Sequence, residues 1–409
     1  MQLFEKLIEY AEAERLVLEK TSRTPVENLS LFEARGLVLS EDLLARFDSP
    51  PFDNSAVDGY AVRAGDTGEN VELEVIDEAP AGRPSTKTVG AGEAIKIFTG
   101  GVIPDGADAV IMVEDTSGWS SEGSSAITIG KSVPEENNIR RSGEDVRSEQ
   151  RILQAGVEVG PYETALAASQ GYGELPVHRR PRVVVLSTGT ELVEPGSRDL
   201  SAGEIFDSNS YAILAQAHEA GAEARRLYAA TDEVEVLRAA LEEALSEADV
   251  VITSGGVSVG EKDLVKSSLE EIGVEQVFWG VKFKPGKPLF FGVRGDSRFF
   301  GLPGNPVRAM VCFELFVRPA LMQMMGRTDH RRPEVQVYFE EDFENRFGRM
   351  HAVRVSLQRT EKGILATSVG AQGSGLITSL TKADAIAMVG PEAHVKAGEM
   401  VEAIVLRDF

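Results

Sequence analysis

Short apolar runs separated by helical patterns fill residues 182–326, and this alternation constrains the fold more than any other feature. The run Val183–Leu186 contains no alternating polar residue, which is typical of a strand buried on both faces. Strands that alternate with helices predict a doubly wound, mostly parallel α/β sheet. The predicted strands are Val183–Leu186, Ala224–Tyr228, Val250–Thr253, Val277–Phe283, Leu289–Val293 and Phe299–Leu302, and the predicted helices are Ser210–Ala220, Val234–Ala244, Asp263–Ile272 and Val307–Met325.

Three further regions flank this α/β segment in a chain of 409 residues, which is too long for one ordinary hydrophobic core. Helical spacing in residues 3–17 and 162–170 indicates a small helical domain that links the others. Short β-prone runs indicate a β-rich inserted domain before the α/β segment and a small β-barrel after it. The expected boundaries are 1–44 with 146–177 for the helical linking domain, 45–145 for the β-rich domain, 178–326 for the α/β domain and 327–409 for the C-terminal barrel.

The formal net charge of −23 argues against nucleic acid or an anionic membrane as the main partner. It does not exclude a small anionic ligand, because surface charges beyond about 8 Å are screened at physiological salt. A lysine ~4 Å from a phosphate contributes about 4 kcal/mol at an effective dielectric of ~20. No apolar run approaches the ~20 residues that span a bilayer, and the N-terminus does not resemble a signal peptide. With Cys312 as the single cysteine, no intrachain disulfide can form, and we expect a cytoplasmic protein.

Glycine-rich and basic loops follow the predicted strands. Ligands of an open α/β sheet bind at the carboxyl ends of its strands, so we expect these loops to gather at one edge. Glycines let backbone N–H groups approach an anion, lysines beside a Pro-Gly turn hold phosphate charge, and a rigid Pro-Gly-Asn-Pro turn presents further N–H groups. The candidate binding residues are Gly255, Gly256, Ser258, Gly260, Lys284, Lys287, Pro303, Asn305 and Pro306.

Three acidic residues in the same loops, Glu191, Asp232 and Asp263, offer the oxygen ligands that Mg²⁺ prefers. The five histidines are scattered without a zinc-binding spacing. Taken singly, each acid has a simpler explanation: Asp232 and Asp263 could cap helices, and Glu191 could be a solvated loop residue. The lysines could likewise be surface charges. The coincidence of all these loops at one edge is what favours a site.

The stretch 256–260 also matches the GxSxG pattern of serine hydrolases, with Ser258 as the nucleophile. In that motif the serine stands directly at the strand-to-helix turn. Here the preceding strand ends near Thr253, a further glycine intervenes, and the downstream histidines lie in or beyond the linker to the C-terminal region. We therefore disfavour a serine hydrolase.

The β-rich region contributes three unusual stretches, at 51–62, 98–101 and 138–145. The third places Arg140 and Arg141 beside Glu144 and Asp145. Such a cluster could bind an anion or could be a structural ion-pair network, and this stretch alone favours the network.

Taken together, the motifs resemble the molybdopterin molybdenumtransferase family, the MoeA-type proteins related to the C-terminal part of gephyrin. The resemblance covers nearly the whole chain, because eight motifs occur in the family's order. They are PFDNSAVDGYAV, FTGGVIPDGAD, NIRRSGED, STGTEL, SGGVSVGEKD, KPGKP, LPGNPV and QGSG. The chain departs from the family's usual residues at Leu264 and Arg308, neither of which is a proposed ligand.

The resemblance implies an enzyme that inserts molybdate into adenylylated molybdopterin and releases AMP, with Mg²⁺ as the cofactor. It implies a homodimer whose site combines the α/β domain of one subunit with the β-rich domain of the other, and molybdopterin adenylyltransferase as a further partner. Carried over by motif, the implied catalytic residues are Asp58, Thr99, Asp145, Glu191 and Asp263; the metal ligands are Glu191, Asp232 and Asp263; and Arg140, Lys284, Lys287, Pro303, Pro306 and Ser374 are implied to bind substrate.

Two other functions stay open on the sequence alone. The α/β domain by itself resembles proteins that catalyse the preceding adenylyl transfer, whereas the β-rich domain favours the insertion step. A non-catalytic, gephyrin-like scaffold is the alternative from another class, and the retention of every proposed acidic and basic position argues against it.

Overall fold

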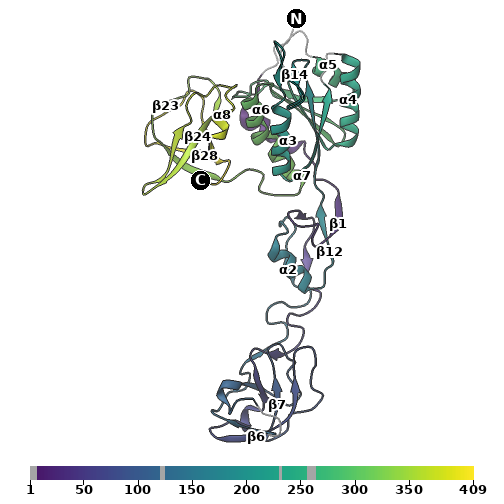
Figure 1. Cartoon of the computed structure of the whole chain (residues 1–409), viewed down its shortest axis with the longest axis vertical. Coiled ribbons are helices and arrows are strands. Elements are labelled where there is room, and N and C mark those ends of the chain that lie inside the picture. The colour runs from purple at the N-terminus through teal and green to yellow at the C-terminus, as the bar shows by residue number, and fades with distance from the viewer. Residues whose placement is uncertain (1–6, 120–124, 230–232, 256–263) are drawn as a thin grey trace. The chain divides into compact units, whose positions relative to one another are not determined.

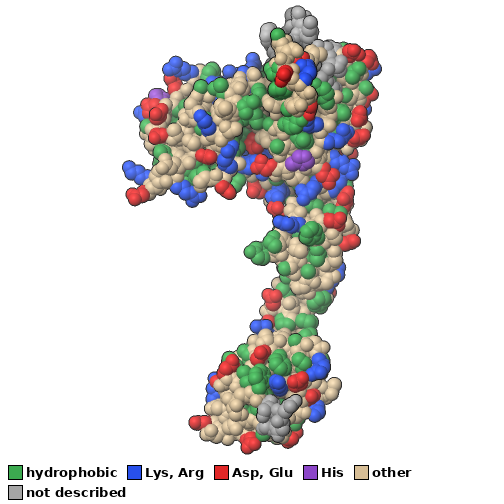
Figure 2. All heavy atoms as spheres, in the orientation of Figure 1, with side chains coloured by type: hydrophobic (Ala, Val, Ile, Leu, Met, Phe, Trp, Pro, Cys, Tyr) green, Lys and Arg blue, Asp and Glu red, His purple; other side chains and the backbone are tan. Residues whose placement is uncertain are grey.

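A computed structural model describes residues 7–119, 125–229, 233–255 and 264–409, without the side chains of 229 and 264–267. The chain forms two compact units. Unit 1 comprises the chain up to Ser40, Gly156–Gly160 and Glu174–Phe409, and unit 2 comprises Glu41–Ala155 and Pro161–Gly173. Among the described residues, no helix is long and apolar enough to cross a membrane. Acidic and basic side chains are interspersed over the face drawn in Figure 2.

A six-stranded sheet forms the centre of unit 1. Four neighbouring strands are parallel, and β20 runs antiparallel to both of its neighbours, which confirms the mostly parallel sheet. In spatial order the strands are β16 (Glu223–Ala229), β13 (Arg182–Thr188), β17 (Val250–Ser254), β21 (Ser297–Leu302), β20 (Phe290–Arg294) and β18 (Glu275–Trp279).

Helices cover both faces of this sheet, as expected for a doubly wound fold (Figure 1). Alternate residues of β13 point to opposite faces: Val183 and Val185 belong to one buried cluster, and Val184 and Leu186 belong to the other. The first cluster packs against α3 (Asn209–Glu219), α6 (Pro306–Cys312) and α7 (Arg318–Met324), and the second against α4 (Val234–Glu247) and α5 (Leu264–Glu271).

Two segments of unit 1 differ in detail from the expected elements. The helix expected at 307–325 contains a π-helical segment, Phe313–Val317, between α6 and α7. Pro319 is the second residue after this segment, and a proline lacks the N–H that a regular turn requires. The strand expected at 277–283 is wrong as one element, because β18 ends before Gly280, whose φ is 83°. The chain resumes as β19 (Phe283–Lys284), which pairs with the C-terminal region.

The C-terminal region is the expected β-barrel, closed by a pairing between β24 and β26. Alternate residues of β24 face different surroundings: Val353 and Val355 fill the barrel, whereas Ala352 joins the buried cluster of the α/β sheet. The barrel strands are β24 (Met350–Thr360), β25 (Gly363–Ser368), β22 (Glu334–Phe339), β28 (Met400–Val405) and β26 (Ala385–Val389).

The two helices expected in one linking domain lie in different units. Helix α1 (Tyr10–Glu19) buries Ala13 and Val17 in the cluster that contains α7, whereas α2 (Pro161–Ser169) belongs to unit 2. Helical periodicity identifies an apolar face but not the element that covers it. A three-stranded sheet of β1 (Val26–Ser30), β12 (Glu174–His178) and β2 (Val38–Leu39) completes unit 1.

Unit 2 is built on a five-stranded sheet with an apolar cluster on each face. Tyr60 and Val62 lie in one cluster, and Ala61 lies in the other. In spatial order the strands are β8 (Ala109–Met112), β5 (Gly59–Val62), β7 (Glu93–Ile97), β6 (Val71–Ala79) and β9 (Ala126–Ile129).

Candidate functional site

The strand ends that adjoin the predicted loops lie together at the carboxyl edge of the six-stranded sheet. β13, β17 and β21 end at the same level, because Ser254 pairs with both Ser187 and Leu302. β20 runs the other way and begins at this edge, since Phe290 pairs with Gly301. The lysine-containing loop before β20 therefore reaches the same edge, as expected.

The backbones of two of these loops touch through their glycines. The N–H of Gly255 donates to the carbonyl oxygen of Leu302 at 2.9 Å, with a φ of 94° at Gly255. A Cβ added to Gly304 would lie 3.6 Å from the Cα of Gly255. Because neither position carries a side chain, the two loop backbones can approach each other this closely.

The turn at 303–306 is anchored at both ends. Pro303 is buried at the end of β21, and Pro306 is the first residue of α6, where its lack of an N–H leaves no helical bond unmade. Gly304 and Asn305 between them are exposed. The turn therefore presents its two central residues outward on a fixed frame.

Asn209 joins the glycine loops to helix α3, a contact that the sequence interpretation missed. Its Nδ2 donates to the Oγ of Ser254 and to the carbonyl oxygen of Gly304, both at 2.7 Å. One side chain thus fixes the distance between the ends of β17 and β21. The polar run just before the expected helix was the available signal.

Asp207, two residues earlier, is buried and fastens the same helix to β13. Its Oδ2 accepts from the hydroxyls of Ser187 and Ser210, both at 2.5 Å, and lies 3.5 Å from Arg226. The side chains that hold the edge together are therefore short polar groups at the start of α3.

Glu191 presents an exposed carboxylate in the loop after β13, with no partner among the described residues. An unpaired carboxylate is chemically suited to a hard cation. The other two expected ligands, Asp232 and Asp263, lie outside the described residues, and the described part of the chain holds no cluster of three metal-binding side chains. Gly256, Ser258 and Gly260 also lie outside the described residues.

Lys284 faces the barrel rather than the glycine loops. Its Nζ lies 3.6 Å from the centre of the Phe347 ring, and its strand pairs with His351. Burial, followed by the charges of Arg349 and Arg354, lowers the pKa of Lys284. Burial, followed by the charges of Lys284, Arg354 and Arg349, lowers the pKa of His351 to about 4, so this imidazole is neutral at pH 7.

Arg354 lies near Lys284 and His351. It is fully buried, with 0% of its surface exposed. Its Nη2 donates to the carbonyl oxygen of Gly373 at 3.3 Å, while Nε and Nη1 have no partner among the described residues. Gln372 makes two hydrogen bonds to the Arg354 backbone, at 3.0 and 3.1 Å, which holds the loop of Ser374 beside the guanidinium. A buried cation with two unsatisfied donor nitrogens is a strong attractor for an anion.

Lys287 is exposed on the other side of a tight turn. Gly286 at its centre is buried with a φ of 131°, and a Cβ there would overlap the Sγ of Cys312 in α6. Only glycine fits this position. Burial raises the pKa of Cys312 to about 12, so this cysteine is an inert buried residue and not a reactive thiol.

Unit 2 gathers its own predicted residues. The Oδ1 of Asp58 accepts from the backbone N–H and the hydroxyl of Thr99, both at 2.8 Å, and these bonds lower the pKa of Asp58. The strand pairing of 139–140 with 54–55 sets the 138–145 stretch against the loop that precedes Asp58.

The two arginines in that stretch differ in their ion pairs. Arg141 forms ion pairs with Asp53 and Glu136, as the structural interpretation expects. Arg140 is exposed and has no partner among the described residues, and Asp145 is also exposed. The structural network therefore accounts for Arg141 and leaves the guanidinium of Arg140 available.

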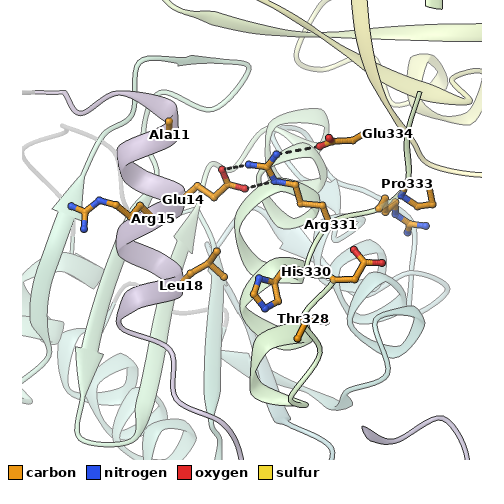
Figure 3. Close-up of a pocket in the computed structure, with 11 residues that line it drawn as sticks. Ala11, Glu14, Arg15, Leu18, Thr328, His330, Arg331, Pro333 and Glu334 are labelled. Carbon is orange, nitrogen blue, oxygen red and sulfur yellow. Dashed lines mark hydrogen bonds and ion pairs between the residues drawn. The ribbon is translucent and has the colours of Figure 1, made fainter. Parts of the chain in front are cut away.

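A separate hollow of about 660 Å³ lies between α1 and residues 328–334. Figure 3 shows Arg331 between Glu14 and Glu334 in this hollow. The guanidinium is bonded to both acids, with Nε 2.7 Å from Glu14 Oε1. This hollow contains none of the predicted site residues, and its ion pairs serve to attach α1 to the barrel linker.

Comparison with known proteins covers the same regions. Residues 8–171 match the MoeA N-terminal region (domain I and II), 184–323 match a probable molybdopterin binding domain, and 336–406 match the MoeA C-terminal region (domain IV). The molybdopterin molybdenumtransferase of Haemophilus influenzae is 38% identical over 92% of this chain and 93% of its own length. The molybdopterin molybdenumtransferase of Bacillus subtilis is 37% identical over 97% of this chain and 94% of its own length. The chain belongs to the molybdopterin molybdenumtransferase family.

A solved family structure, described as the molybdopterin biosynthesis MoeA protein of Pyrococcus horikoshii, is similar over 99% of this chain and 100% of its own. The TM-score is 0.84 at 32% identity. We call the region around Lys284, His351, Arg354 and the loop of Ser374 the barrel junction. The sheet edge and the barrel junction therefore belong to the family fold.

The predicted site residues that the structure describes fall into three groups in this chain. The roles themselves stay predictions. Glu191, Gly255, Lys287, Pro303, Asn305 and Pro306 lie at the sheet edge, Lys284 and Ser374 lie at the barrel junction, and Asp58, Thr99, Arg140 and Asp145 lie in unit 2.

Proposed function

We propose that this protein inserts molybdate into adenylylated molybdopterin and releases AMP. Its family membership supports the reaction class. The observation that carries the proposal is the buried, unsatisfied guanidinium of Arg354 beside Lys284, because a reaction that consumes an oxyanion requires a site for one.

The cationic junction suits a tetrahedral oxyanion such as molybdate. Arg354 offers two donor nitrogens, Nε and Nη1, and Lys284 offers an ammonium group. Neither of these nitrogens of Arg354, nor the Nδ1 of neutral His351, has a partner among the described residues. Isolated buried charge is unfavourable, and a bound dianion would relieve it through charge-assisted hydrogen bonds. Arg140, which the family resemblance implies to bind substrate, stays a second candidate in unit 2.

The sheet edge suits the phosphate groups of the substrate. The backbone N–H groups of Gly304 and Asn305 and the exposed ammonium of Lys287 would stabilise the negative charge that develops as AMP departs. Asn209 would act as a positioning residue, since it holds the two glycine loops in register.

Mg²⁺ is part of the proposal, with Glu191, Asp232 and Asp263 as its ligands. The unpaired carboxylate of Glu191 fits a hard cation. When bound, Mg²⁺ would neutralise charge on the phosphoanhydride. We also propose a cytoplasmic homodimer with a site shared between subunits, which receives its substrate from molybdopterin adenylyltransferase.

The decisive experiment measures AMP release from adenylylated molybdopterin with molybdate and Mg²⁺. We expect release that depends on both, and its absence would overturn the proposal. ATP consumption with unmodified molybdopterin would instead favour the adenylyltransferase alternative. Full function of Glu191→Gln in cells would favour a scaffold, and light scattering of the purified protein tests the dimer.

A further inference from the structure

An exposed aromatic stack lies on unit 2, and none of its three rings has a predicted role. Trp119 stacks on Phe98, with ring centroids 5.4 Å apart and an interplanar angle of 25°. The buried Tyr60 supports it from a centroid distance of 5.7 Å. Trp119 is 41% exposed, which is unusual for a large ring that could bury itself.

Among the described residues, the recorded ring and cation neighbours of Trp119 are Phe98, Tyr60 and Lys96, and none of them stacks on its outer face. The Nζ of Lys96 lies 4.8 Å from the centroid of Trp119 and 5.1 Å from that of Phe98. Since the two ring centroids are 5.4 Å apart, Nζ and the two centroids form a nearly equilateral triangle. The ammonium therefore lies beside the stack, not over the outer face of Trp119, and Phe98 holds the inner face.

A carboxylate stands next to this stack. Asp58 directly precedes β5, and the register of β5 with β7 sets it opposite Phe98, because Gly59 pairs with Ile97. The Thr99 bonds to its Oδ1 confirm the contact. Alternation puts Asp58, Tyr60, Lys96 and Phe98 on one face of the sheet. The Oδ2 of Asp58 has no partner among the described residues.

We propose that Trp119 and Asp58 together bind the pterin ring of the substrate. The fused ring would stack on Trp119, while the pyrimidine ring's amino and lactam N–H groups both donate to the Oδ2 of Asp58, because Oδ1 already accepts two hydrogen bonds from Thr99. A carboxylate accepts but does not donate, so it selects an edge with two adjacent donors. Pterin and guanine have that edge, whereas adenine offers only its amino group. This inference rests on the proposed function and adds the subsite that orients its substrate.

Tryptophan fluorescence tests the stack directly. The chain has two tryptophans, and Trp279 is buried at 9% exposure, so a quenching ligand reports on Trp119. We expect pterin to quench the full-length protein more strongly than GMP, and AMP to quench least. Preference for AMP would overturn the carboxylate argument, and preference for GMP would overturn the assignment to pterin.

Calorimetric titration with pterin compares three variants. Trp119→Leu should weaken binding on the order of tenfold, since stacking of a base on an aromatic side chain contributes about that much or more. Trp119→Phe keeps a ring and should recover most of the affinity. Tyr162→Leu removes another exposed aromatic residue of unit 2 and should bind as the parent does. Equal affinity of Trp119→Leu and the parent would overturn the proposal.

The AMP-release assay separates this inference from the proposed function. We expect Trp119→Leu to raise KM for adenylylated molybdopterin on the order of tenfold, with a smaller effect on kcat. AMP release with an unchanged KM would refute the subsite and leave the function intact. Pterin binding that depends on Trp119, in a protein that releases no AMP, would refute the function and leave the subsite.

Discussion

Arg354 is the residue on which the oxyanion proposal depends most directly. Replacing it by methionine keeps the volume and removes the buried charge, so we expect KM for molybdate to rise at least tenfold, since a charged hydrogen bond contributes about 1.5–3 kcal/mol. The melting temperature without molybdate should hold, because the lost cation has two unsatisfied donor nitrogens. Arg359→Met, at an exposed position of the same strand, is the control. An unchanged KM for molybdate would exclude Arg354 from the site.

His351 gives the junction a predictable pH dependence. Its pKa falls from 6.5 to about 4 on folding, so between these values the unfolded chain binds a proton that the native protein does not. The unfolding free energy should therefore decrease from pH 6.5 to 4 by roughly 3 kcal/mol, and this contribution should change no further below pH 4. Denaturant titrations of His351→Gln should show a shallower decline. The exposed His218→Gln should match the parent, and an identical slope in all three proteins would contradict the assignment.

At the scale of elements, Asn209 couples α3 to the ends of β17 and β21. Asn209→Ala removes both hydrogen bonds, so we expect kcat/KM for AMP release to fall roughly tenfold, with stability reduced by about 1–2 kcal/mol. Asn209→Asp keeps the shape but places an acceptor against the carbonyl oxygen of Gly304, and it should be no better. Full activity of either variant would show that the loops hold their register without this side chain.

The elements of the α/β sheet could be predicted from the sequence, whereas contacts between distant elements could not. Periodicity located β13 and α4 because their burial follows from the local order of apolar residues. A strand buried on both faces is a continuous apolar run, and a helix buried on one face has apolar residues at helical spacing. The barrel pairing of Lys284 depends on a strand about 70 residues later in the chain, which no local pattern encodes. Arg354 was missed for the same reason. It lies on the face of β24 that meets the α/β domain, where a charged residue is expected only if something pairs with it.

At the scale of the whole molecule, the two units have separate hydrophobic cores. The clusters of unit 2 include no residue of unit 1, so we expect two transitions in scanning calorimetry. Arg354 and Lys284 belong to unit 1, and a ligand stabilises only the part that binds it. Molybdate at ~100 times its Kd should therefore add about 2.7 kcal/mol to one transition and leave the other in place. Arg354→Met should abolish that shift, whereas Arg359→Met should preserve it. If molybdate moves both transitions equally, or moves only the transition that Trp119→Leu perturbs, the oxyanion site does not lie at the barrel junction, and Arg140 becomes the better candidate.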